Sequence, residues 1–200
     1  SNDNVIAGNY IGALTPAGGA TGGTQPGDGI VVLGSRNVIG GSAAGDGNVV
    51  AGNNVGIRVD GEAADDNVII GNRIGTDATG TIAIGNWLSG ILVRNGADGT
   101  VIGGLTAAER NIVSGNVYDG IDISAASTTG TVVRGNHIGI DASGLVALGN
   151  GLYGIAVSDG ASGTIIGGTS AAAGNVISGN GLDGIIIDAT ATAATIEHNF

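Results

Sequence analysis

The chain has 200 residues, with 42 glycines, 18 asparagines, two prolines and no cysteine, methionine or lysine. Glycine without a strict Gly-X-Y period excludes collagen, and 42% hydrophobic residues in regular β-branched runs exclude disorder. The net charge of −11 argues against nucleic acids and membrane surfaces as partners, no apolar run is long enough for a transmembrane helix, and without cysteine there are no disulfides.

Residues 1–28 come first and differ from the rest of the chain, because both prolines, Pro16 and Pro26, lie there. Proline removes ladder donors and blocks strand addition. We therefore predict an irregular N-terminal partial turn that could cap the first complete turn.

From Gly29 onward the sequence repeats every 64 residues, and each unit contains two shorter turns that begin with Gly-Ile. Every turn holds three β-branched runs separated by Gly, Asn, Asp, Ser and Thr, which is typical of strands and turns rather than helices. This spacing predicts five complete turns over 29–183, namely 29–55, 56–89, 90–119, 120–153 and 154–183, and a partial last turn over 184–200.

The first run of each turn predicts two inward columns, because strand side chains alternate with a period of two. The columns are Ile30, Ile57, Ile91, Ile121, Ile155 and Ile185, and Val32, Val59, Val93, Ile123, Val157 and Ile187. Between them lies a mixed column predicted to face solvent: Val31, Arg58, Leu92, Asp122, Ala156 and Ile186. Aligning 131–136 with 195–199 places Glu197 in the inward column of the second strand, which predicts a solvated or capped end.

A polar column follows glycine in successive turns: Asn53, Asn86, Asn116, Asn150 and Asn180. Asparagine tolerates left-handed backbone conformations and its amide can bond the asparagine stacked above it. The column predicts a corner-forming ladder with a structural role.

The Asn-x-Ile-x-Gly-Asn and Gly-Ile-x-Val runs, with Ile-Gly-Thr-Asp-Ala-Thr-Gly at 74–80, resemble the right-handed parallel β-helix repeats of bacterial secreted and surface proteins. The resemblance covers about 4–199 and implies an all-β solenoid with three strands per turn and about six turns. Pectate lyases and related polysaccharide enzymes share this fold, so the resemblance says more about fold than about function.

A catalytic site would lie on the outward face of the first strand, where successive turns converge. Its polar candidates are Arg58, Asp60, Arg94, Asp122, Ser124 and Asp188. Asp60 and Arg94 share a column and are predicted to form a surface ion pair. Asp122 and Asp188 lie two turns apart, so we find no convergent carboxylate pair, and the sequence assigns no catalytic, cofactor or metal residue.

Other candidates have plainer explanations. The acidic loop 60–66 could hold calcium, but its spacing fits no calcium loop and a solvated turn explains it. Asp77 and Asp141 suit Asx turns, and His137 and His198 are predicted to be surface histidines.

Trp87, Tyr118 and Tyr153 fall in equivalent connections of successive turns. Exposed, they could hold sugar rings, since their faces are flat and apolar. The alternative that we favour is packing over a corner beside Leu88, Leu152 and Leu182.

Two functions are consistent with these observations. The first is a non-catalytic structural or adhesive module of a bacterial extracellular or cell-surface protein, such as a stalk, adhesin or filament segment. The second is a polysaccharide-binding or polysaccharide-degrading domain, a lyase or hydrolase, with its site on the outward face of the first strand. Open strand edges at the ends of the solenoid also allow end-to-end self-association.

Overall fold

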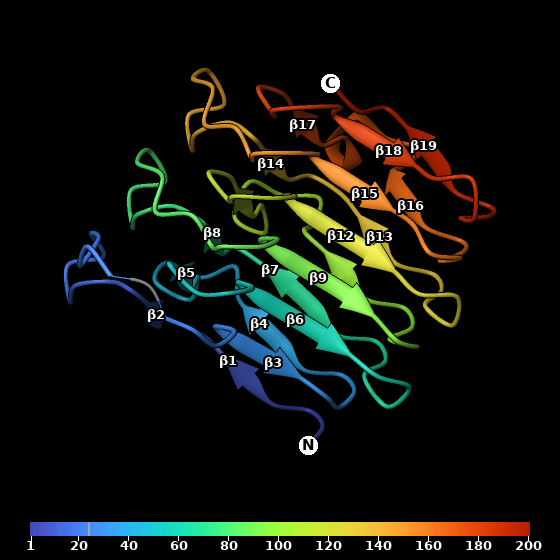
Figure 1. Ribbon diagram of the computed structural model, residues 1–200, viewed down its shortest axis with the longest axis horizontal. Coiled ribbons are helices and arrows are strands. Elements are labelled where there is room, and N and C mark those ends of the chain that lie inside the picture. The colour runs from blue at the N-terminus through green and yellow to red at the C-terminus, as the bar shows by residue number, and fades with distance from the viewer. Residues whose placement is uncertain (24) are drawn as a thin grey trace.

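The computed structural model describes residues 1–23 and 25–200 and shows a right-handed parallel β-helix (Figure 1). The chain winds through three parallel sheets in turn, which we name A, B and C in the order in which the chain enters them. Thr24, within the predicted N-terminal segment, lies outside the described residues.

Each strand has two to four residues and pairs with its equivalents in the turns below and above. Sheet A contains β1 (Val5–Ile6), β4 (Val38–Gly40), β7 (Val68–Ile70), β10 (Val101–Ile102), β13 (Val132–Val133), β16 (Ile165–Gly167) and β19 (Thr195–Glu197). Sheet B contains β2 (Tyr10–Gly12), β5 (Val49–Ala51), β8 (Arg73–Ile74), β11 (Ile112–Val113), β14 (His137–Ile138) and β17 (Val176–Ile177). Sheet C contains β3 (Ile30–Val32), β6 (Ile57–Asp60), β9 (Ile91–Arg94), β12 (Ile121–Ser124), β15 (Ile155–Val157) and β18 (Ile185–Ile187).

A short 3-10 helix, η1 (Ala171–Ala173), precedes β17. Among the described residues no helix has the length and apolarity that crossing a bilayer requires. Residues 1–28, predicted as an irregular partial turn, contain β1 and β2, which pair in register with β4 and β5.

The dry interior predicted from the aliphatic columns is confirmed. Ile91, Ile121 and Ile155 are each fully buried, and their neighbours above and below share one core cluster. Sheets A and B add inward columns of their own, for example Ile69 and Ile74. Because each turn contributes only about one or two side chains per sheet, the core exists only where turns stack.

Asparagine ladders close two of the corners. The predicted column is confirmed, since Asn53, Asn86, Asn116 and Asn150 each donate from Nδ2 to Oδ1 of the next asparagine at 2.8–3.1 Å. A longer ladder between sheets A and B was not predicted from the sequence. Its members are Asn9, Asn48, Asn72, Asn111, Asn136, Asn175 and Asn199.

Two sequence-based placements are wrong. Ile196, rather than Glu197, pairs with Ile166, and Glu197 lies opposite Gly167, because the last repeat is one residue shorter than the alignment assumed. In the column predicted to face solvent, Leu92 and Ala156 are only 8% exposed although neither belongs to the central core. Neighbouring outward side chains therefore cover part of sheet C.

Candidate functional site

The outward face of sheet C carries the charged residues selected from the sequence. Register places Arg58, Leu92 and Asp122 in one column, with Asp60 and Arg94 paired in the next. The strands β6, β9 and β12 each have four residues, so every outward side chain on this face is held by a paired backbone.

The two arginines of this face are neutralised. Arg58 pairs with Asp28 at 2.7 Å (Nε to Oδ2) and also with Asp60. The predicted pair of Asp60 and Arg94 is confirmed at 3.2 Å. Asn95 donates to the other Asp60 oxygen at 2.8 Å. Burial by itself would raise the pKa of Asp60, but the hydrogen bonds from Asn95, Arg58 and Arg94 outweigh it and lower that pKa.

Asp122 and the nearby Asp119 form no ion pair with an arginine of the described residues. Asp122 lies in register between Leu92 and Ala156, and its Oδ1 is buried with no hydrogen-bond partner. Burial, reinforced by the Asp119 carboxylate, raises the pKa of Asp122 to about 6. Burial also raises the pKa of Asp119, whose Oδ1 accepts a hydrogen bond from the Tyr153 amide at 3.1 Å.

The structure does not bring Asp188 to Asp122. Asp188 closes its own turn by accepting hydrogen bonds from the amide and hydroxyl of Thr190 at 2.8 and 2.7 Å. Those bonds lower the pKa of Asp188 to about 2. A carboxylate with this pKa is ionised at neutral pH, and the carboxylates that act on Asp122 are those of Asp119 and Asp159 instead.

Aromatic and aliphatic side chains form an exposed stripe at the corner between sheets B and C. Backbone hydrogen bonds stack Leu88, Tyr118, Leu152 and Leu182 in successive turns. We call this stripe, together with Trp87, the aromatic corner. The predicted position over the corner beside these leucines is found for Tyr118, but Trp87 is 55% exposed and Tyr118 46%, while Tyr153 is half-buried.

A groove of about 280 Å³ runs along the aromatic corner. Trp87, Leu88 and Tyr118 form its apolar side, and Gln25, Pro26 and Asn54 form the rest. Asn54 also donates a hydrogen bond to Asp28 at 3.0 Å. The groove therefore borders the charged network of sheet C, an adjacency that the sequence could not show.

The remaining candidates have structural roles. Asp77 and Asp141 close hairpin turns, as predicted, since their Oδ1 atoms accept backbone amides such as those of Ile82 and Val146. In the acidic loop 60–66, the Asp60 carboxylate is bonded by arginine and asparagine, and no cluster of three metal-binding side chains occurs in the described part of the chain.

The two histidines differ. His198 is exposed, as predicted. The prediction of a surface position is wrong for His137, which is 5% exposed beneath the hairpin 140–147, with Nδ1 3.3 Å from the Asp141 carbonyl oxygen. Burial and the nearby Arg110 lower the pKa of His137.

No family model matches this chain, and no curated protein matches its sequence. Its fold is similar to that in the crystal structure of the periplasmic alginate epimerase AlgG, with a TM-score of 0.61 at 17% identity over 96% of this chain and 39% of that one. A mutant of AlgG gives a TM-score of 0.62 with the same identity and coverage. The A-module of mannuronan C-5 epimerase AlgE6 from Azotobacter vinelandii gives 0.45 at 17% identity, over 88% of this chain and 55% of that one.

The chain thus spans about two fifths of the length of AlgG. Similarity at this identity establishes the parallel β-helix fold that the repeats predicted.

Proposed function

We propose that the aromatic corner and the adjoining face of sheet C bind a polysaccharide. The observation that carries the proposal is the exposure of Trp87 and Tyr118 along one groove that also contains the amides of Asn54 and Gln25. Flat aromatic faces stack on the apolar faces of sugar rings, and amide groups bond sugar hydroxyls. Exposed aromatic patches of this kind rarely lack a partner.

The charges of this face favour a neutral polysaccharide. Arg58 and Arg94 are already bonded to aspartates, whereas Asp119 and Asp122 have no cationic partner. Carboxylates accept strong hydrogen bonds from sugar hydroxyls but repel uronate or sulfate groups.

The fold supports a polysaccharide ligand in general. AlgG is an enzyme named for a polysaccharide, and 96% of this chain superimposes on 39% of its solved structure. Of the two sequence-based hypotheses, this favours the polysaccharide-related one over the non-catalytic stalk or adhesin segment. AlgG is periplasmic, and we propose a periplasmic or extracellular location for this chain also.

Affinity electrophoresis against a panel of neutral and acidic polysaccharides tests the proposal. We expect retardation in gels that contain a neutral polysaccharide, and loss of retardation in Trp87→Ala and Tyr118→Ala. The matched control is Leu145→Ala, which removes an apolar side chain that is 88% exposed on a hairpin. Unchanged migration in every neutral gel, or equal loss in the control, would reject the proposal.

A second candidate function is polysaccharide processing, with Asp122 transferring the proton. It rests on the buried, unbonded Oδ1 of Asp122 beside the sugar-binding face. A carboxyl group with a pKa of about 6 can act as a general acid near neutral pH. We expect Asp122→Asn to abolish turnover of the polysaccharide even at saturating concentrations, and Asp188→Asn to leave turnover intact. Equal turnover by the Asp122→Asn variant would refute this role.

A further inference from the structure

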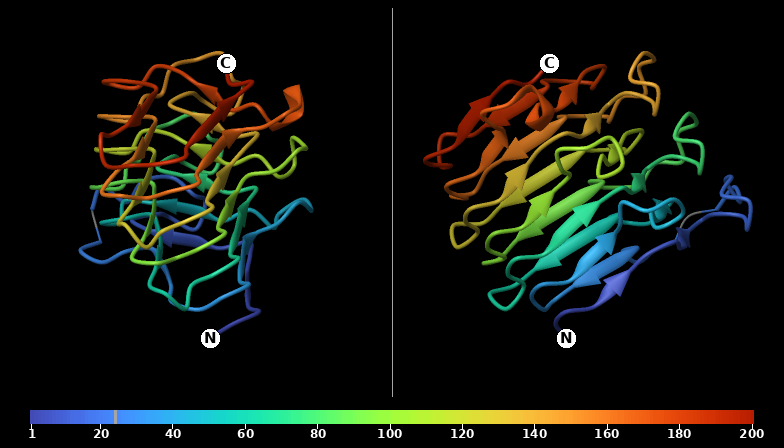
Figure 2. Two further views of the ribbon diagram at one scale, coloured as in Figure 1. Left: turned by 90° about the vertical axis from the view of Figure 1, so that its right-hand side faces the viewer. Right: turned by 180° about the vertical axis from the view of Figure 1, so that it is seen from behind.

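Sheet B lies at the bottom of a trough, because the connections on both of its sides are long in alternate turns. On one side, the connections 41–48, 103–111 and 168–175 between sheets A and B project from the solenoid (Figure 2, left). On the other side, three hairpins project between sheets B and C (Figure 1). The hairpins are closed by the bridges Leu14–Ala20, Thr76–Ala83 and Ile140–Ala147.

The hairpins form one continuous wall. Ala78 donates its amide hydrogen to the Gly18 carbonyl at 3.1 Å, and Ala142 donates to the Gly80 carbonyl at 2.9 Å. Hairpins two turns apart therefore contact each other directly, and the trough is closed on that side along three hairpins.

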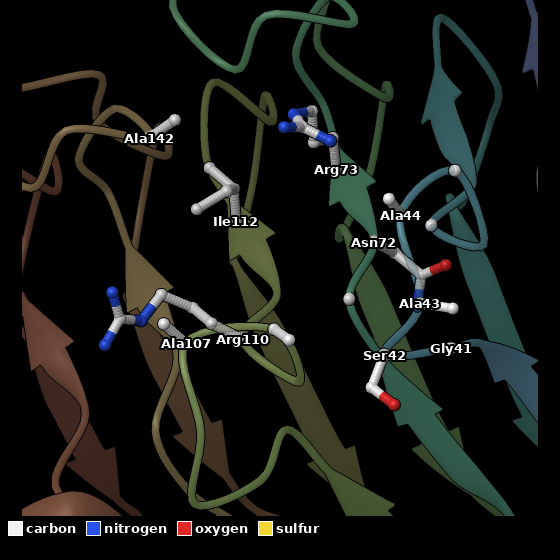
Figure 3. A pocket seen from close by; sticks show the side chains of 14 residues that line it. Gly41, Ser42, Ala43, Ala44, Asn72, Arg73, Ala107, Arg110, Ile112 and Ala142 are labelled. Atoms are coloured by element: carbon white, nitrogen blue, oxygen red, sulfur yellow. The ribbon is translucent and has the colours of Figure 1, made fainter.

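A groove of about 550 Å³ opens inside the trough (Figure 3). It lies where the connection between β7 and β8 is only Gly71 and Asn72, while the neighbouring connections 41–48 and 103–111 are long. Its lining is mostly glycine and alanine, so the walls are smooth and backbone-rich. The charged residues that line it are Arg73 and Arg110.

Arg134 lies in the next turn, outside the lining of the groove, where β13 ends. Arg73, Arg110 and Arg134 come from three consecutive turns but do not share a column. Arg73 lies opposite Ile112, and Ile112 opposite His137, so Arg110 precedes this row by two residues and Arg134 by three. The Nε atoms of Arg73 and Arg134 are buried without a hydrogen-bond partner. Arg110 donates from Nε to the Gly135 carbonyl at 3.1 Å.

Among the described residues, no carboxylate lies within ion-pair distance of these three arginines, whereas the other three arginines are all paired. Three arginines without an ion pair are unexpected in a chain with 17 acidic residues. Glu109, the acidic residue nearest Arg134 in the connection 103–111, instead accepts hydrogen bonds within its own loop, from the Leu105 and Thr106 amides at 3.1 Å.

We propose that the trough binds an acidic polysaccharide, with Arg73 and Arg110 holding its anionic groups. Guanidinium groups bind carboxylates through paired, charge-assisted hydrogen bonds, and a small-residue lining lets a bulky chain approach the backbone. A trough that continues along three hairpins fits a linear polymer better than a single small anion. The net charge of −11 disfavours polyanions over the molecule as a whole, but in physiological salt the screening length is about 8 Å, so the two arginines dominate inside the groove.

Isothermal titration with polyuronate oligosaccharides of defined length tests the proposal on the complete chain. We expect affinity to rise with oligomer length and to fall steeply with added salt. Arg73→Gln and Arg110→Gln should each weaken binding by about tenfold, and Arg73→Lys should weaken it less, because the charge remains.

Two controls separate this site from other effects. Arg36→Gln changes the net charge equally but lies outside the trough, in an exposed pair with Asp3, and Trp87→Ala alters only the aromatic corner. Both should bind the polyuronate normally. Equal weakening by Arg36→Gln, undiminished binding by the Arg73→Gln/Arg110→Gln double variant, or a monosaccharide that binds as tightly as the oligomer would overturn the proposal. Loss of neutral-polysaccharide binding in Trp87→Ala bears only on the aromatic corner.

Discussion

Asn111 donates a hydrogen bond from Nδ2 to the side-chain oxygen of Asn136 at 3.0 Å, one turn further along the solenoid. The same Asn136 oxygen also accepts the backbone amide of Asn111 at 3.2 Å. Because this arrangement recurs along the ladder between sheets A and B, each asparagine fixes both its own turn and the next. The ladder therefore links adjacent turns through residues that lie far apart in the sequence.

Replacing Asn111 by alanine should destabilise the fold strongly. The substitution leaves the buried Asn72 backbone amide without its acceptor and removes one of the two hydrogen bonds to the Ile69 carbonyl, which keeps the one from the Gly103 amide. We expect a loss of about 2–4 kcal/mol in the free energy of unfolding, because buried polar groups lose bonds that water cannot replace. Chemical denaturation measures it, with the exposed Asn2→Ala as control. A loss no larger than that of the control would contradict a structural role for the ladder.

Thr131→Val should stabilise the protein by about 1 kcal/mol. The Thr131 hydroxyl is buried with no hydrogen-bond partner, so an isosteric methyl group removes an unsatisfied polar atom. Thr128 is the matched control, because its hydroxyl is equally buried but donates to the Ser124 carbonyl at 2.8 Å. Thr128→Val should destabilise under the same denaturation assay, and the opposite order of the two variants would show this assignment to be wrong.

Two glycines with the same φ of 92° should respond differently to alanine. A Cβ at Gly40 would lie 1.9 Å from the Ile70 carbonyl oxygen, whereas one at Gly45 would meet nothing within 4 Å. Gly45→Ala should cost only the strain of a left-handed backbone, about 1–2 kcal/mol. Gly40→Ala should cost clearly more, because the clash separates sheet A strands β4 and β7. Similar thermal unfolding of the two variants would contradict this expectation.

Asp122 should make the free energy of unfolding decrease as the pH rises from about 4 to about 6. Its folded-state pKa of about 6 lies above the ordinary value of 3.8, so the protonated form favours folding. That stabilisation is complete below about pH 4 and is lost as pH rises to about 6. Asp122→Asn should therefore be more stable than the wild type at pH 7.5, by about 1–3 kcal/mol, and should lack this step. Denaturation at pH 4, 5, 6 and 7.5 checks it, and parallel profiles of the two proteins would disprove the assignment.

Much of the sheet C face could be predicted from the sequence, but its chemistry could not. The Gly-Ile-x-Val runs predict that Arg58, Leu92 and Asp122 share a column, since side chains alternate along a strand. The exposure of Trp87 depends on whether neighbouring connections cover it, and no local pattern encodes that. Asp122 could be placed on the face, but its raised pKa results from burial between turns.

The amino-acid sequence by itself determined the parallel β-helix, its three strands per turn and its aliphatic core, because a period of two within a strand and a regular spacing of glycines are local signals. Only the tertiary structure decided the ladder of Asn9 to Asn199, whose members are separated alternately by 39 and by 24 or 25 residues. The same alternation of long and short connections builds the trough and brings Arg73 and Arg110 to one groove. Loop lengths show which turns project, but whether projecting loops stack into walls depends on contacts between residues that are far apart in the chain.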